Sequence, residues 1–267
     1  MKTGVSYMGH HNPRHLESDL KDIKALGCND VLLVAQENDF VYMRGNLDFF
    51  PRLAKEQGIR PLAIFWGGAM NYFGGGKSSQ FLLDHPKAHQ VNQDGSYNPA
   101  GCYNNLEVVK HIRGMIDRIA ELGFSGYFID EPSQLDCFCP ACVQIYHDMY
   151  RGDLFQANAE QAAQFRKKCV VRYICLLTDD IKLTYPHMET LCCMMPCDKI
   201  AWDNISRIDS LDNLGADIYW VNNNTPAEEM RPIIQDMDKI CKRGNKKHHQ
   251  WLQCWGVKKG KEHRIKE

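Results

Sequence analysis

The chain has 267 residues, of which 44% are hydrophobic and 24% charged, and its net charge is −1. This composition is typical of a globular protein, and the length suits a single domain over residues 1–267. A net charge so near zero provides no bulk attraction for nucleic acid, and no stretch approaches the roughly 18 apolar residues of a membrane span. Residues 1–15 contain no run of signal-peptide length, so we expect the twelve cysteines to be thiols or metal ligands in the cytoplasm.

Short apolar runs alternate with amphipathic stretches through the first half of the chain. Leu16, Leu20 and Ile23 follow one another at spacings of three and four, which predicts a helix after the first apolar run. A longer stretch with the same pattern ends at Gly123, a residue typical of helix ends. We expect strands over 3–9, 29–35, 60–66 and 125–131, and helices over 13–28, 45–57 and 104–123.

The second half repeats this alternation. Thr225 followed by Pro226 is typical of an N-cap and the first position of a helix. We expect helices over 158–183, 199–215 and 225–244, and strands over 189–195, 216–222 and 248–256.

This order of elements predicts the fold class. Strands that are apolar on both faces, each followed by a helix, indicate a parallel sheet covered by helices. Seven such units favour an α/β (β/α)8 TIM barrel over a doubly wound sheet, because the chain has neither a GxGxxG after its first strand nor a P-loop. We expect a barrel that lacks its last β/α unit. The chain is then C-terminally incomplete, or a partner or an irregular segment fills the gap.

Polar and aromatic residues follow the expected strands, where a parallel barrel forms its active site. Aromatic rings beside hydrogen-bonding groups suit a carbohydrate, whose CH-rich faces stack on rings while its hydroxyls need polar partners. The candidate substrate-binding residues are His10, His11, Trp66, Trp220, Asn222, Gln253 and Trp255.

Two adjacent acids, Asp130 and Glu131, end the fourth expected strand. Strand neighbours point to opposite faces, so both can face a substrate only if the strand becomes irregular. Pro132 predicts an extended Glu131 at the end of the strand, where it is better placed to reach the mouth of the barrel. A carboxyl desolvated by aromatic rings there would keep its proton near neutral pH and act as a general acid. The alternative is that both acids cap a turn or pair with basic groups.

The loop after these acids contains a C-x-C-x2-C run, formed by Cys137, Cys139 and Cys142. Thiolates at this spacing can coordinate one tetrahedral zinc, which needs a fourth ligand. We expect Cys102 in that role, because loops after adjacent barrel strands lie together. His111 and His147 are alternatives within helical stretches. Four thiolates leave no position for water, so such a zinc would be structural. A disulfide or unligated thiols would also explain the run.

Three segments, "GCYNN" (101–105), "FIDEP" (128–132) and "CFCPAC" (137–142), together resemble the retaining glycosidases built on a (β/α)8 barrel. They are most similar to the zinc-carrying β-galactosidases, whose fourth strand ends in Asn-Glu before a C-x-C-x2-C run. They also resemble a broader set of glycosyl hydrolases with an Asp-Glu-Pro fourth strand. The resemblance implies that Glu131 is the acid/base. It also implies four zinc ligands, Cys102, Cys137, Cys139 and Cys142.

The chain departs from this family at two positions. Asp130 stands where the family has Asn, and Gln253 stands where a nucleophilic Glu is expected at the end of the seventh strand. The resemblance therefore assigns no second carboxylate. The candidates, in order of preference, are Asp130, Glu37 and Glu262.

The sequence thus predicts a glycoside hydrolase with a structural zinc, a carbohydrate substrate and no nucleic-acid or membrane partner, and it leaves homo-oligomerisation open. A carbohydrate-binding barrel without catalysis is the first competing hypothesis, favoured by Gln253 and the missing unit. A hydrolase with a catalytic zinc is the second, and an assembly subunit whose missing strand comes from a partner is the third.

Overall fold

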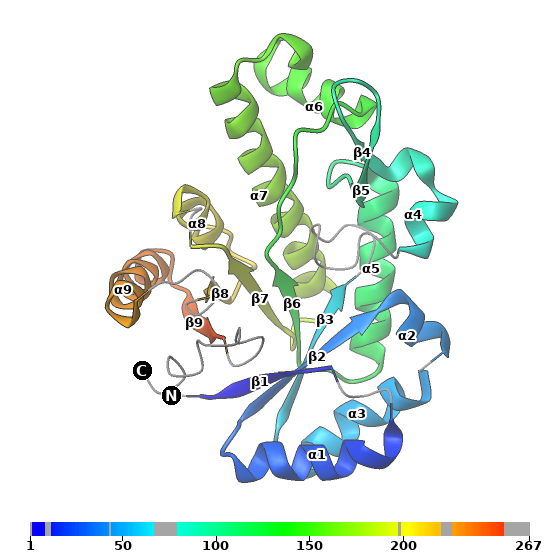
Figure 1. Ribbon diagram of the computed structural model, residues 1–267, viewed down its shortest axis with the longest axis vertical. Helices are drawn as coiled ribbons and strands as arrows, with labels where there is room; N and C mark the ends of the chain where they lie inside the picture. Colours follow the sequence, from blue (N-terminus) through cyan, green and yellow to red (C-terminus); the bar gives the residue numbers. More distant parts are fainter. Residues whose placement is uncertain are drawn as a thin grey trace.

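The computed structural model describes residues 2–8, 12–42, 44–66, 79–196, 199–219 and 226–253. Within these residues seven parallel strands form one sheet, in the order β1-β2-β3-β6-β7-β8-β9. They are Gly4–Tyr7 (β1), Asp30–Gln36 (β2), Arg60–Trp66 (β3), Gly126–Asp130 (β6), Glu189–Met194 (β7), Asn213–Ile218 (β8) and Lys247–Leu252 (β9). The sheet curls (Figure 1), and no pairing joins β1 to β9 in the described chain. The expected α/β fold is confirmed as a TIM-barrel-like sheet that lacks one unit.

Helices connect the strands, because parallel neighbours need a crossover. They are Pro13–Ala25 (α1), Glu37–Tyr42 (α2), Arg44–Glu56 (α3), Gln80–Asp84 (α4), Leu106–Glu121 (α5), Pro140–Tyr150 (α6), Ala159–Thr184 (α7), Lys199–Ser206 (α8) and Ala227–Arg243 (α9). Two 3-10 turns, Pro86–Ala88 and Leu154–Gln156, and an antiparallel hairpin of His89–Val91 (β4) and Tyr97–Gly101 (β5) complete the set. None of the described helices is both long and apolar enough to cross a membrane.

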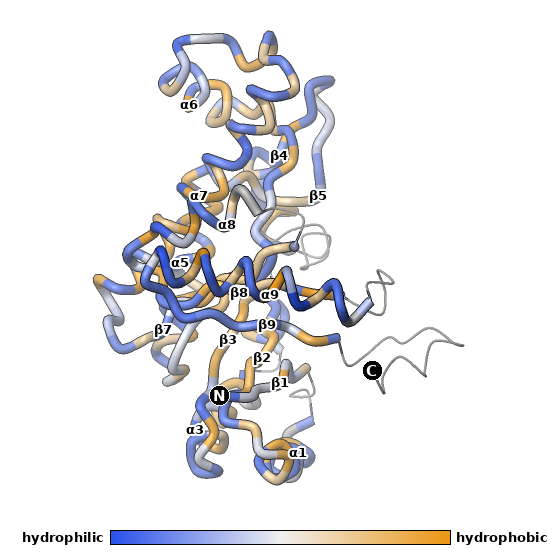
Figure 2. The backbone as a smooth tube through the Cα atoms, turned by 90° about the vertical axis from the view of Figure 1, so that its left-hand side faces the viewer, coloured by the Kyte–Doolittle hydropathy of each residue, from blue (hydrophilic) through white to orange (hydrophobic). Residues whose placement is uncertain are grey.

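The two faces of the strands bury different cores. Outward side chains such as Leu33, Ile129 and Leu214 join the helices in one continuous core. Inward side chains, including Ile64 and Phe128, form a smaller cluster inside the curl. In Figure 2 helix α9 alternates between hydrophilic and hydrophobic residues, as expected of a helix with one face on the sheet. Burial on both faces explains why the inner strands are apolar runs, whereas the outer strands β1 and β9 are more exposed.

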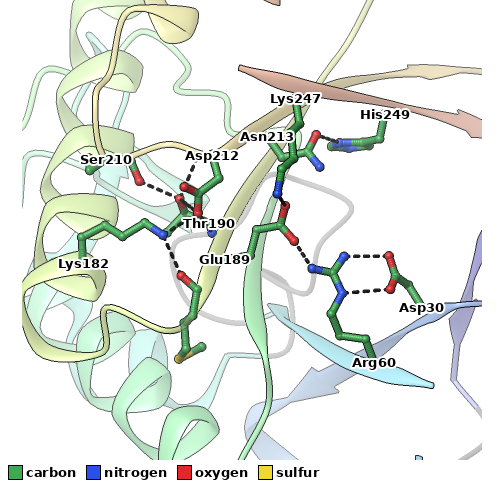
Figure 3. Close-up of polar contacts among 11 residues, drawn as sticks. Asp30, Arg60, Lys182, Glu189, Thr190, Ser210, Asp212, Asn213, Lys247 and His249 are labelled. Atoms are coloured by element: carbon green, nitrogen blue, oxygen red, sulfur yellow. Dashed lines mark hydrogen bonds and ion pairs between the residues drawn. The ribbon is translucent and has the colours of Figure 1, made fainter. Parts of the chain in front are cut away.

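A charged network lies inside the curl at the amino-terminal end of the strands (Figure 3). Arg60 on β3 donates hydrogen bonds to Asp30 on β2, at 2.9 and 2.7 Å, and pairs with Glu189 on β7. Lys247 on β9 reaches Glu189 at 3.2 Å. Burial acts to raise the pKa of Glu189, but the charges and hydrogen bonds of Arg60 and Lys247 together outweigh burial and lower that pKa. Four charges of balanced sign therefore connect strands that are far apart in the sequence.

His249 on β9 lies one layer above this network and packs against Gly215 on β8. A Cβ atom at Gly215 would lie 2.3 Å from the His249 ring, so only glycine leaves the ring enough room. Burial lowers the pKa of His249 to about 4, so the ring is neutral near pH 7. Its Nδ1 lies 2.8 Å from Oδ1 of Asn213 and donates to it.

Two expected boundaries in the second half are wrong. Helix α8 ends at Ser206 rather than at residue 215, and β8 begins at Asn213 rather than at residue 216. Leu211 and Leu214 continue the helical spacing of apolar residues, but residues 213–216 pair with β7 instead, so tertiary pairing decides their conformation. Helix α9 begins at Ala227, with Pro226 at the N-cap, and Thr225 lies outside the described residues.

Candidate functional site

One pocket lies where the carboxyl ends of β6, β8 and β9 meet. Asp130 is the last residue of β6 and faces the interior, as Phe128 does two positions earlier. Asp217, Tyr219 and Gln253 line the same pocket. The structure therefore brings the expected residues Asp130 and Gln253 together with an acid that sequence reasoning missed.

Glu131 departs from the regular strand. Its φ is +37°, in the left-handed region, so the extended conformation expected before Pro132 is wrong. Its backbone N–H donates to the carbonyl of Cys193 on β7 at 2.9 Å. This backbone turn removes the restriction that adjacent strand residues face opposite sides. Asp130 faces the pocket, and the next residue, Glu131, hydrogen-bonds to Asp217, which lines the same pocket.

Asp217 is a buried acid of this pocket whose pKa is raised. It lies in β8 opposite Trp251 of β9 and is 5% exposed. Burial raises the pKa of Asp217 to about 8, and the charge of Asp130 and the hydrogen bond to Glu131 contribute. The hydroxyl of Tyr219 donates to Oδ2 of Asp217 at 3.5 Å. Asp217 is the single acid within the otherwise apolar run 214–218, and this was the feature of the sequence that could have identified it as a site residue.

Glu37 has a different environment. It is the first residue of α2, and its carboxylate accepts hydrogen bonds from Ser79 Oγ at 2.6 Å and from Phe81 N at 3.1 Å. His111 Nε2 lies 3.4 Å away. Burial opposes ionisation, but the hydrogen bonds from His111, Ser79 and Phe81 outweigh it and lower the pKa of Glu37. These contacts join α2 to α4 and α5.

The other expected substrate-binding and catalytic residues fall where the structure gives no side-chain description. Trp66 ends β3, and only its backbone is described. Outside the described residues lie His10, His11, Trp220, Asn222, Trp255 and Glu262.

Four buried cysteines gather beyond the carboxyl end of β6, in the part of the chain that contains β4, β5 and α6 (Figure 1). They are Cys102, Cys137, Cys139 and Cys142. The Cys102 sulfur lies 3.4 Å from that of Cys142 and 3.5 Å from that of Cys139, and all four sulfurs lie within 4.8 Å of one another. Tetrahedral zinc with Zn–S bonds of about 2.3 Å needs sulfurs about 3.8 Å apart, so the spacing fits one ion. The group includes neither His111 nor His147.

Amide groups surround these sulfurs. The backbone N–H of Val91 donates to Cys137 Sγ at 3.4 Å. The side-chain amides of Asn104 and Gln134 donate to Cys142 Sγ at 3.3 and 3.4 Å. Donors directed at sulfur stabilise thiolates, the form that binds metal.

Because the four thiols lie so close together, their pKa values differ from one another. Hydrogen bonds from neighbouring thiols, Cys102 foremost, lower the pKa of Cys139, whereas the pKa of Cys102 itself is raised. Four thiolates this close repel one another, so they ionise together only beside a cation. A divalent ion would release the remaining protons and complete a closed shell of four sulfur ligands. The residues present therefore fit a metal ion.

No family model matches the chain, and no curated protein matches it. Solved structures with a similar fold include the β-galactosidase of Bacillus circulans sp. alkalophilus, with a TM-score of 0.70 and 12% identity over 90% of this chain and 43% of that one. The β-galactosidase of the haloarchaeon Halorubrum lacusprofundi has a TM-score of 0.65 and 16% identity over 82% and 40%. The endo-β-1,4-mannanase of Thermotoga petrophila has a TM-score of 0.60 and 13% identity over 93% and 59%.

These similar structures are glycoside hydrolases, and at such low identity they establish a shared fold. The expected resemblance to barrel glycosidases is confirmed at this level. The chain spans less than half the length of the two β-galactosidases.

Proposed function

We propose that the chain is a glycoside hydrolase in which the Glu131–Asp217 pair donates a proton and Asp130 stabilises positive charge on the sugar. The observation that carries this proposal is the pKa of Asp217, raised to about 8 beside two other carboxyl groups. Ordinary Asp and Glu side chains lose their protons near pH 4, so a general acid at neutral pH needs such a shift. The fold shared with β-galactosidases and a mannanase supports the same function.

The pair holds one proton between its carboxyl groups, because two anions in contact repel each other when one is buried and the other half-buried. Glu131 passes this proton to the glycosidic oxygen as the bond to the anomeric carbon breaks, and that carbon gains positive charge. Asp130 faces the pocket and stabilises that charge as an anion. Water then adds to the anomeric carbon, and its proton returns to the Glu131–Asp217 pair. Asp130 thus takes the place of the missing seventh-strand glutamate, ahead of Glu37 and Glu262.

The substrate is a carbohydrate, and Gln253 in the pocket would bind one of its hydroxyl groups. Further contacts are proposed for the residues that follow the other strands. These are His10, His11, Trp66, Trp220, Asn222 and Trp255.

The metal in the proposed enzyme is zinc, because four sulfur ligands at tetrahedral spacing suit this ion. Its ligands are Cys102, Cys137, Cys139 and Cys142. Bound there, zinc would stabilise the loop after β6. A closed shell of four thiolates leaves no position for a catalytic water, which argues against a zinc-activated hydrolase.

The experiment is hydrolysis of a panel of aryl glycosides by zinc-loaded protein and by Glu131→Gln. We expect the variant to lose about 10²- to 10⁴-fold in kcat/KM on poor leaving groups. The loss should be smaller on dinitrophenyl glycosides, whose leaving group needs no proton. Glu107→Gln, at an exposed position on α5, is the control and should keep the wild-type rate. Full turnover by Glu131→Gln would reject the assignment of the acid.

A second candidate is a carbohydrate-binding protein without catalysis. It is favoured by Gln253, the amide that follows β9 where the resemblance leads us to expect a carboxylate. Titration calorimetry with the sugars of the same panel separates the two functions. Binding without turnover of any glycoside would select the second candidate.

A further inference from the structure

Gln134 connects the four-cysteine centre to the segment that begins at Glu131. It is polar yet only 6% exposed. Its Nε2 donates to Cys142 Sγ at 3.4 Å, and its Oε1 accepts from the backbone N–H of Tyr103 at 3.2 Å. One side-chain amide therefore spans a sulfur of the centre and the backbone beside Cys102.

Tyr103 extends this connection back toward Glu131. Its hydroxyl accepts a hydrogen bond from the backbone N–H of Ser133 at 3.2 Å. Its ring is fully buried and stacks on Tyr173 of α7, with centroids 4.0 Å apart and an interplanar angle of 3°. Residues 133 and 134 are thus held against a rigid part of the core, two and three positions after Glu131.

These anchors lie on one side of a residue with unfavourable backbone geometry. A non-glycine residue in the left-handed region is strained, and it persists only where its surroundings hold it. On the other side, the Glu131 N–H is fixed to the Cys193 carbonyl. An extended Glu131 would turn its side chain to the face opposite Asp130 and away from Asp217.

We propose that Gln134 is a positioning residue through which the four-cysteine centre determines whether Glu131 reaches Asp217. The inference rests on the proposed function, because it gives the metal centre a part in preparing the acid. With a metal bound, coordination fixes Cys142, and the Gln134 amide transmits that fixed position to the chain after Glu131. Without the ion this anchor loosens, Glu131 relaxes toward the extended region, and Asp217 loses its partner.

The test follows the protonation of the pair directly, by carbon-13 NMR of labelled Asp and Glu carboxyl groups in the full chain, without a substrate. In zinc-loaded wild-type protein we expect one carboxyl group to titrate near pH 8. Removing zinc with a chelator should lower the midpoint of that titration by about one pH unit or more, since Asp217 loses the contact with Glu131. Added zinc should restore it. In Gln134→Leu the titration should lie at the lower pH whether or not zinc is bound.

Gln90→Leu is the matched control. Gln90 is also a buried amide beside this loop, but it bonds Leu135 N and the Gly101 carbonyl, both at 3.0 Å, rather than a cysteine. It should keep the zinc-dependent titration, and cobalt absorption reports whether each variant assembles the centre. If Gln134→Leu does not fold, zinc removal from the wild type decides alone.

Two results would overturn the inference. One is a wild-type titration that stays in place when zinc is removed, and the other is an equal change in Gln134→Leu and Gln90→Leu. Neither measurement uses hydrolysis, so an absence of glycosidase activity would reject the proposed function and leave this test unaffected.

Discussion

Asp217 on β8 and Glu131, the residue directly after β6, share a hydrogen bond although strand β7 lies between β6 and β8. The curl of the sheet and the left-handed backbone at Glu131 together make this contact. It places a proton-holding carboxyl group beside Asp130 at the mouth of the barrel-like sheet.

Asp217→Asn should stabilise the fold at alkaline pH and have little effect near pH 4. The pKa of Asp217 is about 8 in the folded chain. In the unfolded chain it is near 4, so the folded state binds the extra proton between these values. The stability that this proton provides is complete below pH 4 and is lost as pH rises to 8.

Asparagine does not titrate, so the gain at pH 8 should be on the order of a few kcal/mol. Urea unfolding at pH 4 and pH 8 measures it. Asp22→Asn, at an exposed position on α1, should show no pH-dependent gain. An equal gain at both pH values for Asp217→Asn would contradict the buried-proton assignment.

Under the proposed function, glycoside hydrolysis should fall on the alkaline side with an apparent pKa near 8, because the acid form of the pair is lost there. In Asp217→Asn this limb should move to lower pH, since Glu131 no longer has a second carboxyl group beside it. The measurement is kcat/KM against pH for both proteins on a glycoside with a poor leaving group. An alkaline limb that stays in place would separate Asp217 from the acid.

The sequence was sufficient to predict the sheet and the cysteine group. Strands apolar on both faces alternated with helical spacing, and this local pattern survives in the fold because both faces are buried. The run at Cys137, Cys139 and Cys142 has the short spacing of a single metal loop. The position of Cys102 followed from the neighbourhood of two barrel loops.

The acid pair could not be predicted, because it depends on tertiary structure. Asp217 was expected near the start of a strand over residues 216–222. Strand β8 instead begins at Asn213, three residues before 216, so Asp217 lies near its end. The left-handed φ of Glu131 contradicts the local preference before proline, so only its surroundings can enforce it. The resemblance directed attention to the seventh strand of the sheet, which is β9. The partner of Glu131, Asp217, lies instead on the sixth strand of the sheet, which is β8.

Metal removal should lower the stability of the fold, and the bound ion should have no open coordination position. We expect chelation to lower the melting temperature, and cobalt-substituted protein to show thiolate charge-transfer bands that do not change when anions are added. Affinity should rise with pH, because binding releases thiol protons. Cys102→Ser should weaken binding, and Cys28→Ser, outside the group, should not. Anion-sensitive cobalt spectra would favour a catalytic metal.

Arg60→Met should destabilise the chain by roughly 2–4 kcal/mol, because it leaves Asp30 without this cation and leaves Glu189 paired only with the exposed Lys247. The effect should shrink at low pH. The pKa of Glu189 is held below its ordinary value, so the stability of this pair is present above about pH 4.5 and is lost as pH falls below it. Arg52→Met removes an exposed pair with Glu56 and should cost under about 1 kcal/mol. Equal losses in urea unfolding would refute a special role for the interior network.

Gly215→Ala should destabilise the fold by about 1–3 kcal/mol, because the added methyl group would lie within 2.6 Å of three atoms of the His249 ring. The ring cannot easily withdraw, since its Nδ1 bonds Asn213 and its face packs near Phe128. Gly114→Ala is the matched control. Gly114 is exposed on α5 with no atom within 4 Å of its added Cβ, so the same substitution should stabilise the helix by about 0.5–1 kcal/mol. Thermal unfolding of both variants should show a loss of stability for Gly215→Ala and a gain for Gly114→Ala. A Gly215→Ala protein as stable as the wild type would mean that β8 and β9 are less closely packed here.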